Sequence, residues 1–308
     1  MKKAVRFGIL LILLVSVSSC TSDKEYAQID FSNTIPAQKP SEGNKESGTL
    51  RVAVAAMISP KETFVYYKEL IHYLGEAVDK DIRMVQRKTY KEINEMFLKD
   101  DIDLAFICSG PYALEKYRYR FQAIATPVVR GSPFYQSYLI VNKQSQFKKL
   151  TDLRQHTFAF SDPNSNTGAL VPTYWLHQLG ATPDTFFSKT HFTYSHDNSI
   201  LAVAKSLVDA AAVEGHKWEY FHANNDINAS KTRVIKKSEK FGSPPLVASN
   251  MLPDSLKEKI QEAALSMHAG EKGKQILNNL MIDRFSIPEE KWYRPIRAMK
   301  EQLANPGS

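Results

Sequence analysis

Short apolar runs alternate with amphipathic segments of helical period from Leu50 onward, and this alternation limits the possible folds more than any other feature. Residues 50–56 are typical of a strand, and in residues 61–78 apolar side chains recur at three- and four-residue spacings, as in a helix. A βαβα order favours an α/β domain with helices packed on a largely parallel sheet. The pattern continues with strands at 82–86, 103–108 and 122–129 and helices at 90–99 and 111–117.

The alternation restarts after an apolar segment at residues 135–141, which indicates a second unit of the same kind. A Gly-Ser-Pro-Pro break at 242–245 ends this unit. We therefore expect two α/β lobes with a ligand cleft between them, residues 49–138 and 245–308 forming the first and residues 139–244 the second. The second lobe takes strands at 157–160, 190–194, 210–214 and 232–236 and helices at 168–179, 199–207 and 216–222; the strand 246–249 and helices 253–268, 271–284 and 296–303 return to the first.

The N-terminus has the pattern of an export signal. Three cations precede an apolar run at residues 7–17, which is too short to span a bilayer, and small residues then lead to Cys20. This resembles the lipobox of bacterial lipoproteins and implies cleavage after residue 19 and lipidation of Cys20; the alternative is a plain signal peptide with a cysteine near its cut. Residues 20–48 are polar and predict a flexible tether, so we expect an extracytoplasmic, membrane-anchored protein.

Composition excludes several classes of site. Apart from Cys20 the chain has one cysteine, Cys108, in an apolar run that favours a buried, inert thiol. The C-x-x-C spacing that is typical of metal sites is absent. We expect no cofactor. The net charge of +7 falls to +4 without the three signal-peptide cations (7 − 3), and the basic runs lack interleaved aromatics, so nucleic acid is not expected as a partner.

The segment 158–170 combines a short apolar strand, a turn with Pro163, and small polar residues that open a helix. The first turn of a helix has about four unpaired N–H groups and a partial positive charge, and small side chains let an anion approach them. These residues therefore predict a seat for an oxyanion. An ordinary strand-to-helix turn, capped by one of its Ser, Asn or Thr residues, fits the same residues.

The wider chain resembles the phosphonate/phosphite-type substrate-binding proteins of ABC importers, which are type II periplasmic binding proteins. The run Asp-Pro-Asn-Ser-Asn-Thr-Gly-Ala-Leu-Val-Pro at 162–172 is similar to their D-P-x-S-x-S/T-G-x-x-x-P signature, with Asn166 where many members have Thr. The resemblance implies two Rossmann-like lobes joined by a two-stranded hinge. It also implies that Ser165, Asn166, Thr167 and Gly168 surround the anionic head of the ligand.

Weaker similarities to this family extend over residues 50–249. They include a Tyr-rich helix around Tyr67, a strand and loop with Ser109 and Tyr112, and a Tyr-Gln-Ser element at 135–137. A Ser-His-Asp turn at 195–197 precedes Val-Asp-Ala-Ala-Ala-Val-Glu at 208–214, where Glu214 replaces the usual Asp. The resemblance implies that Tyr67, Ser109, Tyr112, His196 and Glu214 complete the ligand site.

Each of these residues also has an explanation that involves no ligand. His196 can donate to an anion as a neutral tautomer or as imidazolium, or simply bond local backbone at a helix start. Glu214 beside an anion requires either a protonated oxyanion or a ligand ammonium, unless it is an exposed strand-end acid. Tyr67 and Tyr112 fit core or surface positions as well as a ligand site, and Trp175 and Trp218 are expected in the core.

The interpretation we adopt is a binding protein without catalysis, a monomer that captures a phosphonate, phosphite or phosphate ester and delivers it to an ABC permease. A sensor that reports the same bound ligand to a membrane-bound signalling partner is the alternative. Hydrolysis is disfavoured because G-x-S-x-G is absent and no activating base adjoins Ser165.

Overall fold

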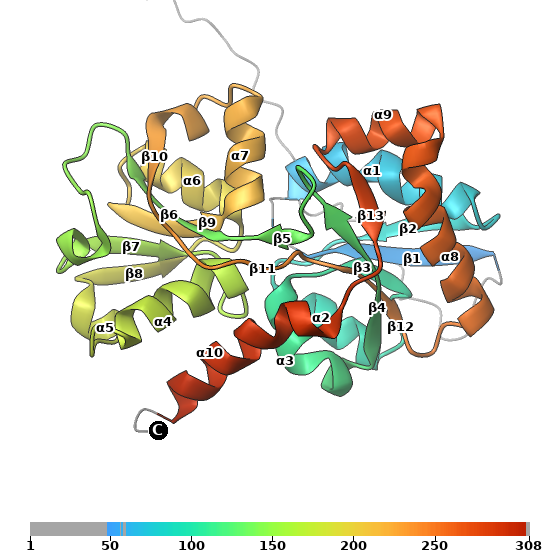
Figure 1. The fold of residues 1–308 in the computed structure, drawn as a ribbon, viewed down its shortest axis with the longest axis horizontal. Coiled ribbons are helices and arrows are strands. Elements are labelled where there is room, and N and C mark those ends of the chain that lie inside the picture. The colour runs from blue at the N-terminus through green and yellow to red at the C-terminus, as the bar shows by residue number, and fades with distance from the viewer. Residues whose placement is uncertain (1–47, 56, 58–59, 306–308) are drawn as a thin grey trace, which may run out of the picture. The chain divides into compact units, whose positions relative to one another are not determined.

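The computed structural model describes residues 48–55, 57 and 60–305, and Figure 1 shows that they form two α/β lobes on separate sheets. The predicted signal peptide, the lipidation of Cys20 and nearly all of the predicted tether fall outside the described residues. Within the described part of the chain, no helix has the length and apolar character needed to cross a membrane.

The first lobe is built on a six-stranded sheet of order β13-β4-β12-β3-β1-β2. Its strands β1, β2 and β3 are parallel, whereas β12 runs antiparallel to both β3 and β4. The predicted sheet is therefore parallel only in part. The elements of this lobe are β1 (Thr49–Val54), α1 (Pro60–Glu76), β2 (Asp81–Val85), α2 (Tyr90–Leu98), β3 (Leu104–Phe106), α3 (Ser109–Tyr119), β4 (Phe121–Val128), β12 (Leu246–Ser249), α8 (Asp254–Ser266), α9 (Glu271–Asn279) and β13 (Arg284–Ser286).

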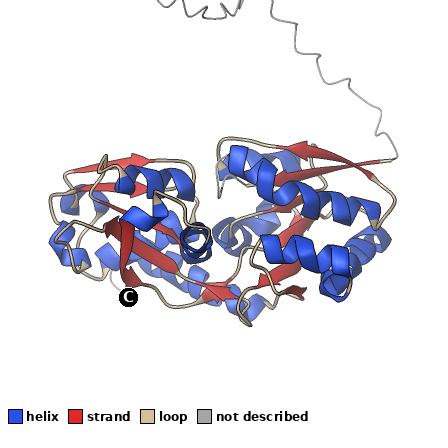
Figure 2. Ribbon diagram, turned by 90° about the horizontal axis from the view of Figure 1, so that it is seen from above, coloured by secondary structure: helices blue, strands red, loops and turns tan. Residues whose placement is uncertain are grey.

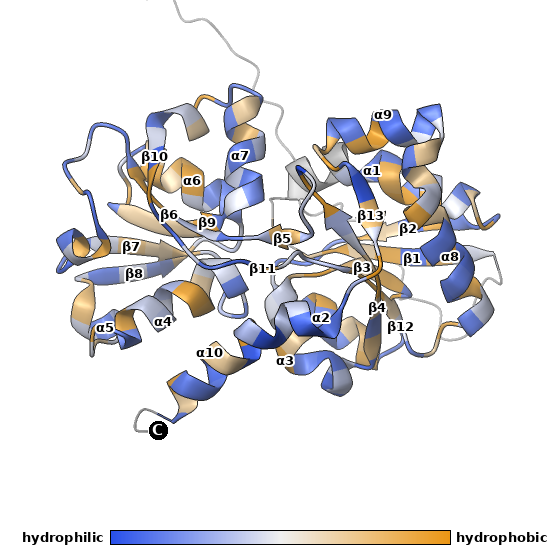
Figure 3. Cartoon of the chain, viewed as in Figure 1, coloured by the Kyte–Doolittle hydropathy of each residue, from blue (hydrophilic) through white to orange (hydrophobic). Residues whose placement is uncertain are grey.

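The second lobe has a five-stranded sheet of order β10-β6-β9-β7-β8, in which β7 pairs in parallel with β8 and β9. Its central strand β9 is buried throughout, and Figure 3 shows the apolar character of the strands inside both lobes. The elements are β6 (Ser137–Asn142), β7 (Thr157–Phe160), α4 (Val171–His177), α5 (Pro183–Phe186), β8 (Lys189–Phe192), α6 (His196–Ala204), β9 (Ala210–Glu214), α7 (Gly215–Ala223) and β10 (Thr232–Lys237).

The chain passes between the lobes twice, through β5 (Phe134–Tyr135) and β11 (Phe241–Gly242), which pair antiparallel (Figures 1 and 2). This confirms the predicted fold class, two α/β lobes with a two-stranded hinge. The lobe boundaries themselves stay a prediction; β6 begins at Ser137 and β12 at Leu246. The last helix, α10 (Arg294–Ala304), contacts both lobes, since Arg297 donates to the Ala113 carbonyl of α3 and Tyr174 of α4 donates to Gln302.

Several predicted elements differ from the structure. The helix predicted at 271–284 ends at Asn279, because Met281 adopts φ +54° and Arg284–Ser286 then pairs with β4 as β13. The helix predicted from Ser199 begins earlier, at His196, because the Ser195 hydroxyl caps it by accepting from the Asn198 N–H. The short elements α5, β11 and β13 carry too few residues for a periodic signal and were not predicted.

Candidate functional site

The segment after β7 forms a tight turn that leads into α4. Ser165 is the cap: its Oγ accepts from the Gly168 N–H at 3.0 Å, and a π-helical turn, Asn166–Leu170, continues into α4. A Cβ at Gly168 would overlap the side chain of Ser161, so only glycine fits there. Ser165 is therefore the helix cap, whereas the hydroxyl of Thr167 has no hydrogen-bond partner among the described residues.

Five buried polar atoms gather around this turn without a hydrogen-bond partner among the described residues: Ser161 Oγ, Asn166 Oδ1, Thr167 Oγ1, His196 Nε2 and Tyr90 Oη. They belong to one neighbourhood. Ser161 packs against Gly168, its carbonyl accepts from the Tyr194 N–H, and the Tyr90 N–H donates to Asp162. Each unpaired buried polar group costs about 1–3 kcal/mol, so such a group calls for a ligand or water that pairs with it.

His196 is held as a neutral donor. Its Nδ1 accepts from the Glu214 N–H at 3.2 Å, and burial, with a smaller effect of Lys217, lowers its pKa to about 3. With Nδ1 as acceptor, the neutral ring carries its proton on Nε2, the atom without a partner. The geometry thus favours the neutral tautomer over imidazolium, with an N–H available to an anion.

Glu214 ends β9 and caps α7, and it is almost fully buried. Burial raises the pKa of its carboxyl, and Lys217 partly counteracts this effect. A raised pKa makes a shared proton with an oxyanion easier to hold. The structure excludes the interpretation of Glu214 as an exposed strand-end acid.

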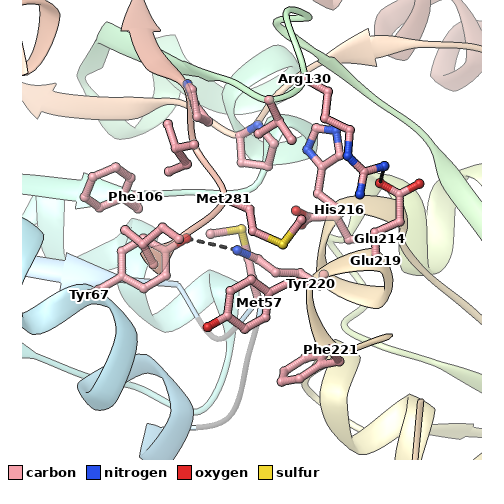
Figure 4. A pocket seen from close by; sticks show the side chains of 16 residues that line it. Met57, Tyr67, Phe106, Arg130, Glu214, His216, Glu219, Tyr220, Phe221 and Met281 are labelled. Atoms are coloured by element: carbon pink, nitrogen blue, oxygen red, sulfur yellow. Dashed lines mark hydrogen bonds and ion pairs between the residues drawn. The ribbon is translucent and has the colours of Figure 1, made fainter. Parts of the chain in front are cut away.

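A cavity of about 60 Å³ lies between the lobes beside Glu214 (Figure 4). Tyr67 lines it, and the dashed line from Tyr67 in the figure marks the hydrogen bond that its hydroxyl accepts from Lys217 Nζ at 3.0 Å. The remaining lining is largely apolar: Met57, Phe106, Pro127, Val129, Tyr220, Phe221, Pro244, Leu280, Met281 and Ile282, with Arg130, His216 and Glu219 at the side of the hinge.

The turn at 165–168 and the unpartnered groups of Tyr90, Ser161 and His196 together are called the seat here. Buried hydrogen bonds connect the seat to the hinge. Tyr135 of β5 accepts from Asn166 Nδ2 at 3.0 Å and also hydrogen-bonds Ser109 at the start of α3. Ser137 donates to the Thr167 carbonyl at 2.6 Å. The structure therefore brings Ser109 and Asn166 together through the hydroxyl of Tyr135.

The lobes also touch across the cleft. The Tyr90 N–H at the start of α2 donates to Asp162 at 3.1 Å, and the His196 N–H donates to the Met57 carbonyl at 3.0 Å. Gly110 in α3 lets the first lobe lie close to the second at this point, because a Cβ at Gly110 would lie 2.7 Å from the Asn164 carbonyl oxygen. The groups of the seat are thus enclosed by residues of both lobes.

Tyr112 does not lie with the residues of the seat. Its hydroxyl donates to Glu290 at 2.8 Å and its ring packs edge-on against Tyr293, so the geometry gives no support to its predicted ligand contact. Trp175 lies in the core as predicted, whereas Trp218 is only partly buried and donates to Thr232. Burial raises the pKa of the Cys108 thiol to about 12, in keeping with an inert side chain.

Four residues of the site were not given as ligand contacts from the sequence: Tyr90, Ser161, Lys217 and Tyr135, the last being noted only within the Tyr-Gln-Ser element. Tyr90 opens a helix after a strand, the same local pattern that pointed to the segment at 158–170, so a signal existed. Lys217 follows the strand-end Glu214 within the first turn of α7, a position that sequence shows but whose orientation it does not. Among the described residues no group of His, Cys, Asp and Glu is arranged to hold a metal ion.

Comparison with known proteins places this site in a family context. Residues 52–293 match the model of the family described as ABC transporter, phosphonate, periplasmic substrate-binding protein. The phosphonates-binding periplasmic protein of Escherichia coli (strain K12) is 30% identical over 178 residues, which cover 56% of this chain and 52% of that protein. The chain thus matches about half the length of this relative.

Two further relatives cover more. A probable ABC transporter phosphite binding protein of Prochlorococcus marinus (strain MIT 9301) is 28% identical over 247 residues, 75% of this chain and 81% of that protein. The crystal structure of a binding protein component of an ABC phosphonate transporter from Pseudomonas aeruginosa superposes with a TM-score of 0.77 at 25% identity, covering 82% of this chain and 85% of that one. The P. marinus structure in complex with methylphosphonate (TM-score 0.74, 22% identity, 83% and 98% covered) shares the fold.

Proposed function

Since the chain belongs to the family of phosphonate periplasmic substrate-binding proteins of ABC transporters, we propose that it captures a small phosphorus oxyanion outside the cytoplasm and delivers it to an ABC permease. Its partners are then the ligand, the permease and, through the lipidated Cys20, a membrane. No chemistry on the ligand is part of this function, and release of product from a bound phosphonate or ester would contradict it.

The observation that carries the proposal is the group of unpartnered polar atoms around the π-helical turn. Ser161, Thr167 and Tyr90 each offer a hydroxyl, and His196 offers its Nε2–H, so four donors can face one anionic head. Hydrogen bonds to a charged group contribute about 1.5–3 kcal/mol each, which offsets the loss of hydration by the anion. Ser165 and Gly168 shape the turn that holds these donors.

Glu214 is the acceptor in this assignment. Because burial raises the pKa of its carboxyl, it can share a proton with a hydrogen-phosphonate or hydrogen-phosphite in place of repelling it. A site with donors on one side and one such acid on the other favours a singly protonated oxyanion. Sulfate and sulfonates, which hold no proton near neutral pH, then bind weakly.

A thermal-shift screen tests the proposal. Methylphosphonate, phosphite, phosphate, sulfate and methanesulfonate are added separately to the mature protein, and unfolding is followed by fluorescence. A ligand present at 100 times its Kd adds about 2.7 kcal/mol to the free energy of unfolding. We expect a clear rise in Tm with at least one phosphorus oxyanion; no rise with any of them contradicts the proposal.

A further inference from the structure

The cavity beside the seat is apolar, and its charges are balanced. It carries two acids and two bases: Arg130 Nη1 pairs with Glu219 Oε2 at 2.9 Å, and Glu214 shares the first turn of α7 with Lys217. His216 adds no charge at neutral pH, because burial lowers its pKa to about 4. A ligand group entering this cavity therefore meets hydrocarbon and no net charge.

The cavity adjoins the seat at His196. The Met57 carbonyl accepts from the backbone N–H of His196, and the Glu214 backbone N–H donates to His196 Nδ1, so two residues of the cavity wall bond to His196 and Glu214 bonds to its imidazole. An oxyanion held by His196 Nε2 consequently has the cavity next to it. The volume of about 60 Å³ is small beside the ~300–1,000 Å³ of sites for drug-sized ligands, so only a short substituent fits.

Lys217 places an ammonium of the protein itself in the wall of this cavity. Its Nζ is fixed by the hydrogen bond to Tyr67 at 3.0 Å and lies 5.3 Å from the centre of the Tyr67 ring, a cation–π contact. Burial acts to lower the pKa of Lys217, but Tyr67 and Glu214 outweigh it and the ammonium stays charged. The counter-charge of Glu214 thus comes from the protein itself, and a second ammonium in the cavity would face Lys217.

We propose that this cavity is the subsite for a short uncharged alkyl substituent on the bound oxyanion. Lys217 makes it discriminate against a substituent that carries an ammonium, and the apolar lining together with Glu214 makes it discriminate against a carboxylate. The inference rests on the proposed function, since the phosphorus head must occupy the seat. Of the two roles that the sequence left open for Glu214, attraction of a ligand ammonium is thereby replaced by its electrostatic interaction with Lys217.

Three phosphonates of equal chain length test this directly by titration calorimetry: n-propylphosphonate, 2-aminoethylphosphonate and 2-carboxyethylphosphonate. They end in a methyl, an ammonium and a carboxylate. The wild-type protein is expected to bind n-propylphosphonate at least tenfold more tightly than either charged analogue. Equal or tighter binding of a charged analogue overturns the inference, and this comparison needs no variant.

Substitution of Lys217 assigns the discrimination to that residue. Lys217→Met leaves Glu214 without a protein ammonium, so the affinity ratio of 2-aminoethylphosphonate to n-propylphosphonate should rise at least tenfold. Lys217→Arg keeps the charge and should keep the wild-type ratio, as should Lys259→Met at an exposed position of α8. An unchanged ratio in Lys217→Met overturns the role of Lys217.

Methylphosphonate separates the two claims, because its substituent is too small to reach far into the cavity. If methylphosphonate binds but the charged analogues bind as well as the propyl compound, only the inference fails. If phosphite or phosphate binds but no phosphonate does, the inference alone fails. If no phosphorus oxyanion binds at all, the proposed function fails, and the inference fails with it.

Discussion

Thr167 offers the most direct single-residue test of the seat, because its buried hydroxyl has no partner among the described residues. Thr167→Val removes one donor and adds a methyl of similar size, and we expect the affinity for the oxyanion to fall at least tenfold. The free energy of unfolding of the ligand-free protein should not fall, since no protein hydrogen bond is lost. Calorimetric titration and chemical denaturation measure the two quantities.

Thr151→Val is the matched control, since Thr151 is exposed and is not one of the residues of the seat. It should leave the affinity as it is. An unchanged affinity in Thr167→Val would remove Thr167 from the ligand site.

His196 makes the stability of the protein depend on pH. Burial lowers its folded pKa to about 3 from an ordinary value of 6.5, so between these values the unfolded chain binds the additional proton. Its contribution is therefore complete above pH 6.5 and is lost as the pH falls toward 3. The loss is at most about 5 kcal/mol, since one pKa unit corresponds to about 1.4 kcal/mol.

Denaturation of the wild-type protein and of His196→Asn at pH 7 and pH 4.5 isolates this effect. Asn can still accept from the Glu214 N–H but does not titrate, so the variant should lose less stability on acidification. Parallel losses in both proteins would show that His196 is not the buried neutral group described here.

For single residues, the sequence predicted which of them lie in the site better than it predicted what each of them does there. Ser165 and Thr167 both fit an anion seat and a helix cap, and only the backbone shows that Ser165 is the cap while Thr167 stays unpaired. Whether a hydroxyl turns toward its own backbone depends on side-chain rotamers, which carry no periodic signal.

The turn between β7 and α4 is an element that tolerates no side chain at Gly168. A Cβ there overlaps Ser161, so Gly168→Ala should lower the free energy of unfolding by about 1–3 kcal/mol and displace the donors of the seat. Chemical denaturation measures the first effect and calorimetry the second.

The clash itself can be tested by relief. Ser161→Gly combined with Gly168→Ala removes the atoms that overlap and should recover part of the lost stability, although a contact with Ser165 remains. Gly270→Ala is the control, because a Cβ at Gly270 meets nothing within 4 Å. If Gly168→Ala is as stable as Gly270→Ala, the side chain of Ser161 does not fill the space beside Gly168.

Short continuous apolar runs were predicted to the residue where they form buried strands, as for β7, β9 and β12. Short elements were not. Phe241–Gly242 becomes a strand only because Phe134–Tyr135 lies beside it, and Arg284–Ser286 only because β4 offers an edge. Two or three residues contain no period, so such pairing is decided by tertiary contact.

At the scale of the whole molecule, Tyr135 links the hinge to both lobes by one hydroxyl, which meets Ser109 on one side and Asn166 on the other. Tyr135→Phe keeps the ring but leaves both partners unsatisfied, which costs about 1–3 kcal/mol for each group left buried. We expect the oxyanion affinity to fall about tenfold, because the enclosed arrangement of the lobes loses this connection.

Tyr117→Phe provides the comparison, since that ring is 87% exposed and its loss should change nothing. Calorimetric titration of both variants with methylphosphonate measures the difference. Equal affinities would mean that the hydroxyl of Tyr135 has no part in holding the lobes around the ligand.

The contacts that enclose the cleft could not be predicted from the sequence. Tyr67 and Lys217 are 150 residues apart, and Tyr90 and Asp162 are 72 apart. The alternation of strands and helices predicts that helix starts gather at the edges of the two sheets, but the distances across the cleft depend on the hinge. Lys217 therefore emerged only from the three-dimensional arrangement.

The central claim is that the unpartnered donors around the turn at 165–168 hold a phosphorus oxyanion. A crystal structure of the mature protein grown with methylphosphonate tests it most directly. We predict phosphonate oxygens within about 2.6–3.2 Å of Thr167 Oγ1 and His196 Nε2, with the methyl group toward the cavity at Tyr67 and Lys217. Phosphonate bound elsewhere, or these atoms still unpaired at saturating ligand, would contradict the account.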